Sequence, residues 1–298
     1  MTDAPFLSRQ ERFRVVGSTN DIVRDWLAGG TPEVCLAVAD EQSAGRGRQG
    51  RTWHAPVGRA LLLSVGFRPA WLVPHRAWRL AAIVSLAMAD AAEEVAGLRD
   101  RTIRLKWPND LVVESEGAVR KVAGVLGETD GLGTADPRVS VGIGVNAGWP
   151  ADEFPAELAT EMTSLEVASG GRPIDLALLL DGFLARLEPR TLALRVGRFD
   201  VGDWIDRQLT NRRLLGLDRS DGSTEIVRAV GVDPDSGALL VEDPSAPAGE
   251  RSILSGEIHH VRLAVNGQDP AASTAAAAST AAAASTGAAG STGAAGQV

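Results

Sequence analysis

The chain has 298 residues, a net charge of −8 and 44% hydrophobic residues. Its length can bury one large core or two smaller ones, and its composition is that of an ordinary globular protein. The negative charge argues against a general binder of nucleic acids or anionic membranes. No N-terminal signal segment is recognisable, and no apolar stretch approaches the about 20 residues of a membrane span, so we expect a cytoplasmic protein without membrane partners.

Cysteine and histidine offer little chemistry in this chain. The lone cysteine, Cys35, excludes an internal disulfide framework and favours a reducing compartment. Cys35 lies in an apolar run, where a small buried hydrophobe is favoured over the alternative of a nucleophilic thiol. The four histidines show no zinc-ligand spacing, so no protein metal site is expected.

The first two thirds of the chain mix helices with strands. A capping sequence, Ser18-Thr19-Asn20-Asp21, precedes apolar positions and predicts an amphipathic helix from Ser18 to Leu27. Periodicity and turn residues predict strands over 34–39, 61–67, 103–107 and 139–145, a hairpin of 111–114 and 119–128, and long helices over 77–98 and 175–194.

From about residue 212 the pattern changes to short strands only, at 214–217, 225–232, 239–241, 251–254 and 258–263, which predicts a small β-barrel. The fold class is therefore α+β, with an added β domain. The expected organisation is a flexible N-terminus over 1–11, a larger domain over 12–208, a small β domain over 209–264 and a disordered Ala/Ser/Thr/Gly tail over 265–298.

Only two of the 30 basic residues are lysines, Lys106 and Lys121. A composition this rich in arginine suggests that lysine is kept where a compact ammonium group is needed, because a planar guanidinium cannot replace it there. Chance survival at the surface is the alternative interpretation.

The segment from Gly45 to Trp53 reads Gly-Arg-Gly-Arg-Gln-Gly-Arg-Thr-Trp between two predicted strands. Its glycines let the backbone expose N–H groups, its arginines carry forked donors for phosphate or carboxylate, and Trp53 offers a flat face for a base. We expect an anion site here. A solvated mobile loop and an RNA-binding Arg-Gly segment are the alternatives, and the ending excludes a Walker loop.

Two more segments carry polar groups at strand ends. Lys106-Trp107-Pro108-Asn109-Asp110 follows a predicted strand, and Pro108 disfavours helix before it. A buried Lys106–Asp110 ion pair without catalysis is the alternative for that segment. Gly142-Ile143-Gly144-Val145-Asn146 ends another strand with an amide that can bind a ribose, a phosphate or a metal-bound water.

Taken in order, Ser18-Thr19-Asn20, the Asp40-to-Trp53 segment, Lys106-to-Asp110, Arg120-Lys121-Val122-Ala123-Gly124 and Gly142-to-Asn146 resemble the biotin protein ligase family, in its monofunctional form without an N-terminal DNA-binding domain. The resemblance covers roughly residues 12–263. It implies a class II synthetase-like catalytic domain with a mixed sheet and flanking helices, followed by an SH3-like barrel. It also implies a biotin–[biotin carboxyl-carrier protein] ligase, which forms biotinyl-5′-AMP from biotin and ATP and then transfers biotin to a carrier lysine.

The resemblance also implies roles for particular residues. The expected catalytic residues are Lys121, Arg48 and Asp110, with Asp110 acting either on the acceptor amine or beside the metal. The expected biotin-binding residues are Ser18, Thr19, Asn20, Gln42, Gly45, Arg46, Arg48, Lys121, Gly124, Gly142 and Gly144. The expected ATP-binding residues are Arg48, Arg51, Trp53, Lys106, Asn109 and Asn146.

The implied cofactors are ATP and Mg²⁺, with the metal held mainly by phosphates and water, and biotin is a substrate. The implied partner is the biotin carboxyl carrier domain of biotin-dependent carboxylases, and no DNA binding is expected. The alternatives are a lipoate-type acyl ligase of the same fold and a non-catalytic biotin sensor.

Overall fold

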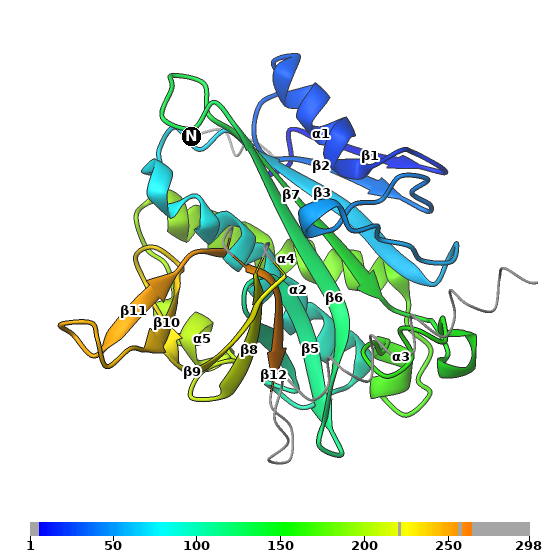
Figure 1. Ribbon diagram of the computed structural model, residues 1–298. Coiled ribbons are helices and arrows are strands. Elements are labelled where there is room, and N and C mark those ends of the chain that lie inside the picture. The colour runs from blue at the N-terminus through cyan, green and yellow to red at the C-terminus, as the bar shows by residue number, and fades with distance from the viewer. Residues whose placement is uncertain (1–5, 220–221, 256–257, 264–298) are drawn as a thin grey trace, which may run out of the picture.

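A computed structural model describes residues 6–219, 222–255 and 258–263 (Figure 1). The N-terminal domain is built on a seven-stranded mixed sheet in the order β1-β2-β3-β7-β6-β5-β4. Only β1 and β2 pair in parallel. The strands are β1 Arg9–Phe13, β2 Cys35–Ala39, β3 Ala60–Phe67, β4 Ile103–Lys106, β5 Asp110–Ser115, β6 Ala118–Asp130 and β7 Arg138–Asn146.

Helices cover both faces of this sheet. Helix α1 (Thr19–Ala28) lies on one face, while α2 (Trp78–Ala96) and α4 (Leu176–Arg195) pack on the other. Helix α2 is apolar around most of its circumference because it lies between the sheet and α4. Asp175 caps α4 by accepting hydrogen bonds from the backbone N–H groups of Ala177 and Leu178. The shorter helices are α3 Leu165–Ala168 and α5 Val201–Asp206, and the 3₁₀ turns are η1 Arg48–Gly50, η2 Pro74–Arg76 and η3 Ala151–Glu153.

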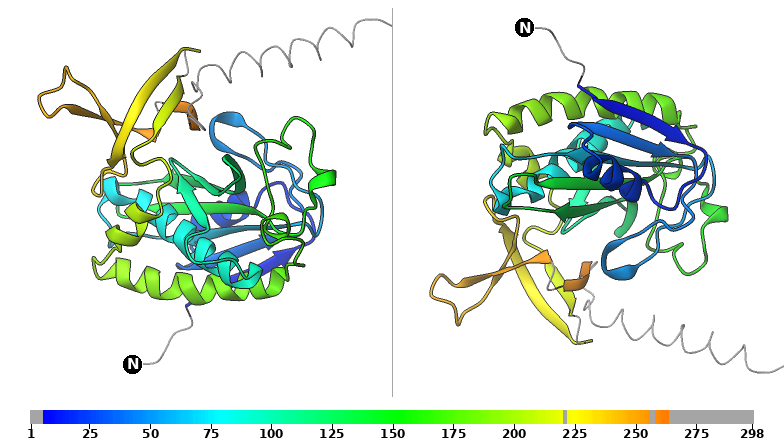
Figure 2. Two further views of the ribbon diagram at one scale, coloured as in Figure 1. Left: turned by 90° about the horizontal axis from the view of Figure 1, so that it is seen from below. Right: turned by 90° about the horizontal axis from the view of Figure 1, so that it is seen from above.

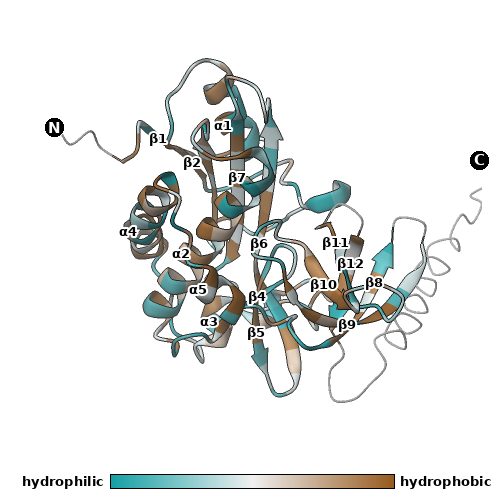
Figure 3. Cartoon of the chain, turned by 90° about the vertical axis from the view of Figure 1, so that its left-hand side faces the viewer, coloured by the Kyte–Doolittle hydropathy of each residue, from teal (hydrophilic) through white to brown (hydrophobic). Residues whose placement is uncertain are grey.

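Strand β3 shows how the alternation of side chains divides the core from the site. Leu61, Leu63 and Val65 belong to the large core shared with α2. Ser64, between them, points to the α1 face, where its hydroxyl bonds Thr19. Apolar residues are accordingly concentrated in the central strands and in the helices packed on them (Figure 3).

The C-terminal domain is a five-stranded antiparallel sheet in the order β11-β10-β9-β8-β12. Its strands are β8 Leu214–Arg219, β9 Thr224–Val232, β10 Leu239–Glu242, β11 Glu250–Ile253 and β12 Ile258–Leu263. Within the described residues no strand pairing joins β11 to β12. The domain lies on the opposite side of the molecule from α4 (Figure 2).

The turn between β9 and β10 packs the C-terminal domain against the N-terminal domain. The indole of Trp78 donates to the carbonyl of Asp235 at 3.0 Å, and the indole of Trp107 donates to the carbonyl of Gly237 at 3.0 Å. Gly237 has φ +72 and packs directly on Trp78, where a Cβ would approach to 2.7 Å. Glycine is therefore required both for the turn and for the close approach.

Most predicted elements are present, and the differences lie at positions where tertiary pairing overrides local pattern. The expectation that residues 1–11 are flexible is wrong for Arg9 to Glu11, which form β1 and pair with β2. The short polar sequence of β1 gives no hydrophobic signal, because β1 is an edge strand. Helices α3 and α5 were not predicted. The expected tail lies outside the described residues, and among the described helices none is long and apolar enough to cross a membrane.

Candidate active site

A cavity of about 420 Å³ opens on the α1 face of the sheet and reaches β12 of the C-terminal domain. Its lining includes every residue predicted for catalysis, biotin or ATP except Gly45. Gly45 lies behind the wall, where a Cβ would come within 2.5 Å of the Trp53 carbonyl oxygen. Segments that are far apart in the sequence thus meet in one cavity.

The floor of the cavity is a continuous chain of polar side chains. The backbone N–H and the hydroxyl of Thr19 donate to Gln42 Oε1 at 2.7 and 3.0 Å. The Thr19 hydroxyl also lies 2.7 Å from the Ser64 hydroxyl, which bonds Asn20 Oδ1 at 2.7 Å. Asn20 Nδ2 donates to Glu128 Oε2 at 3.0 Å. Because these groups hold one another in place, the floor is preorganised for a polar ligand.

Arg46 braces this floor. Its guanidinium binds Asp21 through two hydrogen bonds of 2.8 Å and also lies 3.2 Å from both carboxylate oxygens of Glu128. The hydrogen bond to Asp21 raises the pKa of Arg46, and the same bond lowers the pKa of Asp21. The charge of Arg46 is therefore already neutralised by α1 and β6, so its guanidinium positions the site.

Glycines on adjacent strands make room for the indole of Trp53. Gly124 and Gly144 are paired in the β6–β7 register. A Cβ at Gly144 would lie 2.5 Å from the Trp53 ring, and one at Gly124 would lie 2.9 Å from it. Trp53 Nε1 is buried without a hydrogen-bond partner among the described residues. At Gly142 a Cβ would lie 2.6 Å from Asn20 Oδ1, so this glycine leaves room for the side chain of Asn20 in the polar floor.

Lys121 is aimed into the cavity by an irregularity in its strand. The β5–β6 register shifts between Leu111 and Val112, which places Lys121 opposite Val112 and leaves Val122 on the core side. A bulge of this kind re-aims a side chain by one position. Lys121 and Gly124 consequently share a face, and Lys121 Nζ lies 2.6 Å from Asp110 Oδ1. The ammonium also lies 5.3 Å from the centroid of the Trp53 ring.

The turn from Lys106 to Asp110 is held from both sides. Asn109 Nδ2 donates to the Val125 carbonyl at 2.9 Å, and the Val125 N–H donates to the Asn109 carbonyl at 2.9 Å. Asn146 similarly anchors the end of β7 by donating to the Thr163 carbonyl at 3.1 Å. A buried Lys106–Asp110 ion pair was the alternative for this segment, and in the structure Asp110 pairs with Lys121.

Cations crowd the other end of the cavity. Burial lowers the pKa of Lys106, and the nearby charge of Lys121 lowers it further against the opposing effect of Asp110. Burial and the charge of Arg51 lower the pKa of Arg48. Each cation thus raises the cost of charging its neighbours. An anion placed among them would relieve this repulsion, which makes this end of the cavity an anion site.

Several lining residues were not predicted. Ser64 completes the polar floor, Glu128 supports it from behind through Asn20 and Arg46, and a segment over 158–162 runs alongside Lys121, whose N–H donates to the Glu161 carbonyl at 2.7 Å. The β12 residues Val261 to Leu263 close the cavity from the C-terminal domain. Glu128 and Ser64 lie in predicted strands and could have been proposed from strand alternation. The contribution of β12 carries no signal in the sequence.

The alternative of a nucleophilic Cys35 finds no support. Cys35 is fully buried, and burial raises the pKa of its thiol to about 11, so it is not a nucleophile. In the part of the chain that the structure describes, no group of three or more His, Cys, Asp or Glu residues could hold a metal ion.

The comparisons with known proteins agree with this geometry. Residues 12–146 match the Biotin/lipoate A/B protein ligase family. A Bacillus spizizenii bifunctional ligase/repressor is 32% identical over 250 residues, which cover 82% of this chain and 71% of that protein. A Mycobacterium tuberculosis biotin–[acetyl-CoA-carboxylase] ligase is 30% identical over 251 residues, covering 83% of this chain and 86% of the relative.

A solved structure gives the same result. The biotin protein ligase from Aquifex aeolicus in complex with biotin and ATP superposes with a TM-score of 0.69 at 26% identity, covering 87% of this chain and 100% of that one. The fold and the cavity therefore define a ligase of the biotin/lipoate class. Within that class, the chain belongs to the biotin protein ligase family. The expected α+β fold class and C-terminal β domain are confirmed.

Proposed function

We propose that this chain activates biotin with ATP in the cavity, forming biotinyl-5′-AMP and pyrophosphate, and then transfers the biotinyl group to a lysine of a biotin carboxyl carrier domain. The observation that carries the proposal is the polarity of one cavity. A hydrogen-bonded floor of Thr19, Asn20 and Gln42 lies at one end, and the cations Arg48, Lys106 and Lys121 lie at the other.

The floor suits the ureido ring of biotin. Gln42 Oε1 is occupied by Thr19, so its amide N–H₂ remains as the donor of that side chain. A ureido group carries one carbonyl acceptor and two N–H donors. A site whose buried polar side chains bond these groups rejects a ligand that lacks them, because the side chains would then be left unpaired. This complementarity distinguishes biotin from lipoate, whose dithiolane ring has no such groups.

The cations suit the adenylation step. A carboxylate oxygen of biotin attacks the α-phosphate of ATP, the bond from that phosphorus to the bridging oxygen breaks, and pyrophosphate leaves. Two anions must approach each other, so preorganised cations lower the barrier. The bulge in β6 turns Lys121 Nζ into the cavity, where we expect it to stabilise the developing charge. Arg48, Arg51 and Lys106 supply further positive charge, and Trp53, Asn109 and Asn146 line the part of the cavity that we assign to the nucleoside.

In the transfer step, the acceptor amine attacks the carbonyl carbon of the mixed anhydride, an amide forms and AMP leaves with the bonding electrons. The acceptor must first lose a proton from its ammonium. Asp110 is side by side with Lys121 at 2.6 Å, and a phosphate that binds Lys121 frees this carboxylate. Asp110 then orients the ammonium and accepts its proton.

Mg²⁺ enters with ATP as part of the substrate. We expect the ion to be held mainly by phosphates and water. The biotin carboxyl carrier domain as partner and a cytoplasmic location belong to the same proposal.

The test is to incubate the chain with biotin, MgATP and a biotin carboxyl carrier domain and to weigh the carrier by mass spectrometry. We expect a gain of one biotinyl group on one lysine, and biotin-dependent ATP–pyrophosphate exchange without any carrier. Exchange that required lipoate would overturn the biotin assignment. Binding of biotin without any exchange would indicate a sensor.

A further inference from the structure

The Arg-Gly segment forms a small hairpin of its own. The Gly47 N–H donates to the Arg51 carbonyl at 2.6 Å, and the Trp53 N–H donates to the Gly45 carbonyl at 2.9 Å. The base of this hairpin packs on Gly124 and Gly144 through the indole of Trp53. Its tip, η1, reaches toward the C-terminal domain. The hairpin therefore spans the cavity from the catalytic sheet to the other domain.

The tip binds an end strand of the C-terminal sheet. Gln49 Nε2 donates to the Ile258 carbonyl at 3.0 Å, and Arg48 donates to the same carbonyl at 3.3 Å and to the carbonyl of Ser255. Strand β12 pairs only with β8 among the described strands, so its outer edge has main-chain carbonyls available to other donors. The side chains of Arg48 and Gln49 both donate to the Ile258 carbonyl at that edge.

Gln49 occupies an unusual backbone conformation for this contact. Its φ of 55° and ψ of 44° lie in the left-handed region, which favours glycine and is uncommon for other residues. Gly50, next to it, also has a positive φ of 74°, so the tip has two consecutive residues in this region and only one of them is glycine. A glutamine at this position is explained by the contact of its side chain with β12, since a strained residue persists where its surroundings compensate for the strain.

The same strand forms a wall of the cavity. The residues after Ile258, from Val261 to Leu263, line it together with Arg48 and Lys121. Contact between the hairpin tip and β12 therefore closes the cavity on the side of the C-terminal domain. Opening that contact would open the cavity to solvent.

We propose that Gln49 is a positioning residue that latches the hairpin to β12 and retains the acyl-adenylate between the two half-reactions. The inference rests on the proposed function, because a retained intermediate presupposes two steps. When Arg48 binds the phosphate of the intermediate, its donors leave the β12 carbonyls. The hydrogen bond from Gln49 to β12 then still holds the tip to the strand, because Gln49 is not needed to bind the phosphate.

The test uses the full chain and four substitutions at this position. Gln49→Ala removes the donor, Gln49→Glu replaces it with an acceptor that repels the carbonyl, and Gln49→Arg keeps donors of sufficient length. Labelled biotinyl-AMP is formed on the enzyme, excess unlabelled biotin and ATP are added, and release is followed by rapid filtration. Loss of one neutral hydrogen bond predicts release about 2- to 12-fold faster in Gln49→Ala. We expect at least as large an effect in Gln49→Glu and near wild-type release in Gln49→Arg.

The fourth substitution, Gln49→Gly, separates the side chain from the backbone. Glycine adopts the positive φ without strain. We expect Gln49→Gly to release the intermediate as fast as Gln49→Ala, with ATP–pyrophosphate exchange at saturating substrates unchanged in both. Wild-type release from Gln49→Gly, or from Gln49→Ala with normal exchange, overturns the latch alone. Absence of exchange in the wild-type chain overturns the proposed function instead.

Discussion

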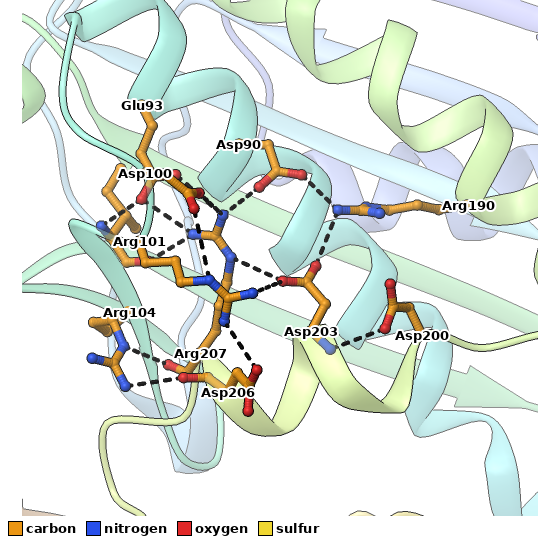
Figure 4. Close-up of polar contacts among 11 residues, drawn as sticks. Asp90, Glu93, Asp100, Arg101, Arg104, Arg190, Asp200, Asp203, Asp206 and Arg207 are labelled. Carbon is orange, nitrogen blue, oxygen red and sulfur yellow. Dashed lines mark hydrogen bonds and ion pairs between the residues drawn. The ribbon is translucent and has the colours of Figure 1, made fainter.

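Two clusters of charged residues in this molecule are built on opposite principles. One surrounds Arg207, where α2, α4 and α5 meet, and the other lines the cavity. Around Arg207 acidic side chains surround a buried arginine (Figure 4). In the cavity, Arg48, Arg51, Lys106 and Lys121 gather with Asp110 as the carboxylate that pairs with Lys121.

The Arg207 cluster neutralises its charges internally. Arg207 is 2% exposed, and it donates to Asp90 Oδ1 at 2.5 Å, to both carboxylate oxygens of Glu93 at 3.1 Å and to the Ile103 carbonyl at 3.0 Å. Burial by itself would lower the pKa of Arg207, but the hydrogen bond and charge of Glu93 and the charge of Asp90 raise it. Glu93 Oε1 also accepts the Ile103 N–H at 2.7 Å.

This contrast indicates that the charges around Arg207 stabilise the fold, whereas those in the cavity are available to a ligand. Arg207 is buried against carboxylates of α2 and α5 and a carbonyl of β4, so the protein neutralises its charge and Arg207 holds these elements together. Burial and a neighbouring cation lower the pKa of Lys106 and of Arg48, so an incoming anion would stabilise their charged forms. Substitutions in the first cluster should therefore change stability, and substitutions in the second should change chemistry.

The largest effect is expected for Arg207→Ala. It leaves Glu93 buried without its cation and leaves Asp90 paired with Arg190 alone, which costs about 3–5 kcal/mol of the free energy of unfolding. Urea unfolding followed by circular dichroism measures the loss. The exposed Arg99, at the end of α2, is the matched control, and Arg99→Ala should stay within about 0.5 kcal/mol of wild type. Equal stability of the two variants would show that the Arg207 cluster is not structural.

Lys121→Ala tests the other cluster. Removing one preorganised donor to a developing charge should lower biotin-dependent ATP–pyrophosphate exchange by about 10²–10³. Lys121→Arg should also lose most activity, because a planar fork does not occupy the position of an ammonium. The control is Arg120→Ala. Arg120 is the neighbour of Lys121 in β6 and its side chain lies on the opposite face of the strand, so this variant should retain exchange. Near wild-type rates for Lys121→Arg would mean that any cation suffices at this position.

Arg48→Gly should separate activation from retention. Loss of a charge-assisted hydrogen bond predicts that biotinyl-AMP escapes about 10- to 150-fold faster. Exchange should persist, because Lys121 and Arg51 remain in the cavity. The measurement is biotin incorporated into added serum albumin, at equal exchange activity for mutant and wild type. A mutant with normal exchange that labels albumin no faster than wild type would show that Arg48 does not retain the intermediate.

The smallest effect concerns Cys35, which belongs to neither cluster. Burial raises the pKa of its thiol to about 11 from the ordinary 9.0, so the unfolded chain loses this proton first as the pH rises. This contribution to stability is complete below pH 9 and is lost between about pH 9 and 11. The loss at pH 10 should be about 1 kcal/mol.

Comparison of wild type with Cys35→Ala isolates this titration. The chain contains no tyrosine, and both proteins share Lys106, whose lowered pKa acts in the opposite direction. The difference in free energy of unfolding between wild type and Cys35→Ala should shrink by that amount from pH 8 to pH 10. A constant difference would mean that the thiol titrates equally in the folded and unfolded chains.

The sequence by itself determined most elements of the fold and nearly all of the cavity lining. Strand alternation and helical periodicity are local properties, so the strands at 34–39 and 61–67 and the helix at 77–98 could be predicted from neighbouring residues. The grouping of Ser18, the Arg-Gly loop and Lys106 to Asp110 followed from the resemblance. The distances and pairings of these residues did not follow from it, because their partners lie far away in the sequence, 108 residues for Asn20 and Glu128 and 210 residues for Arg48 and Ile258.

Only the tertiary structure decided how the charges are used. Arg46 and Lys121 are equally basic in the sequence, yet Arg46 is neutralised by two carboxylates and Lys121 is turned into the cavity by a one-residue bulge. The same holds for Arg207 and for the contact of Gln49 with β12, which join segments that no local pattern connects. The function of a charged residue depends on burial and on the partners that folding brings to it, and both are long-range properties of the chain.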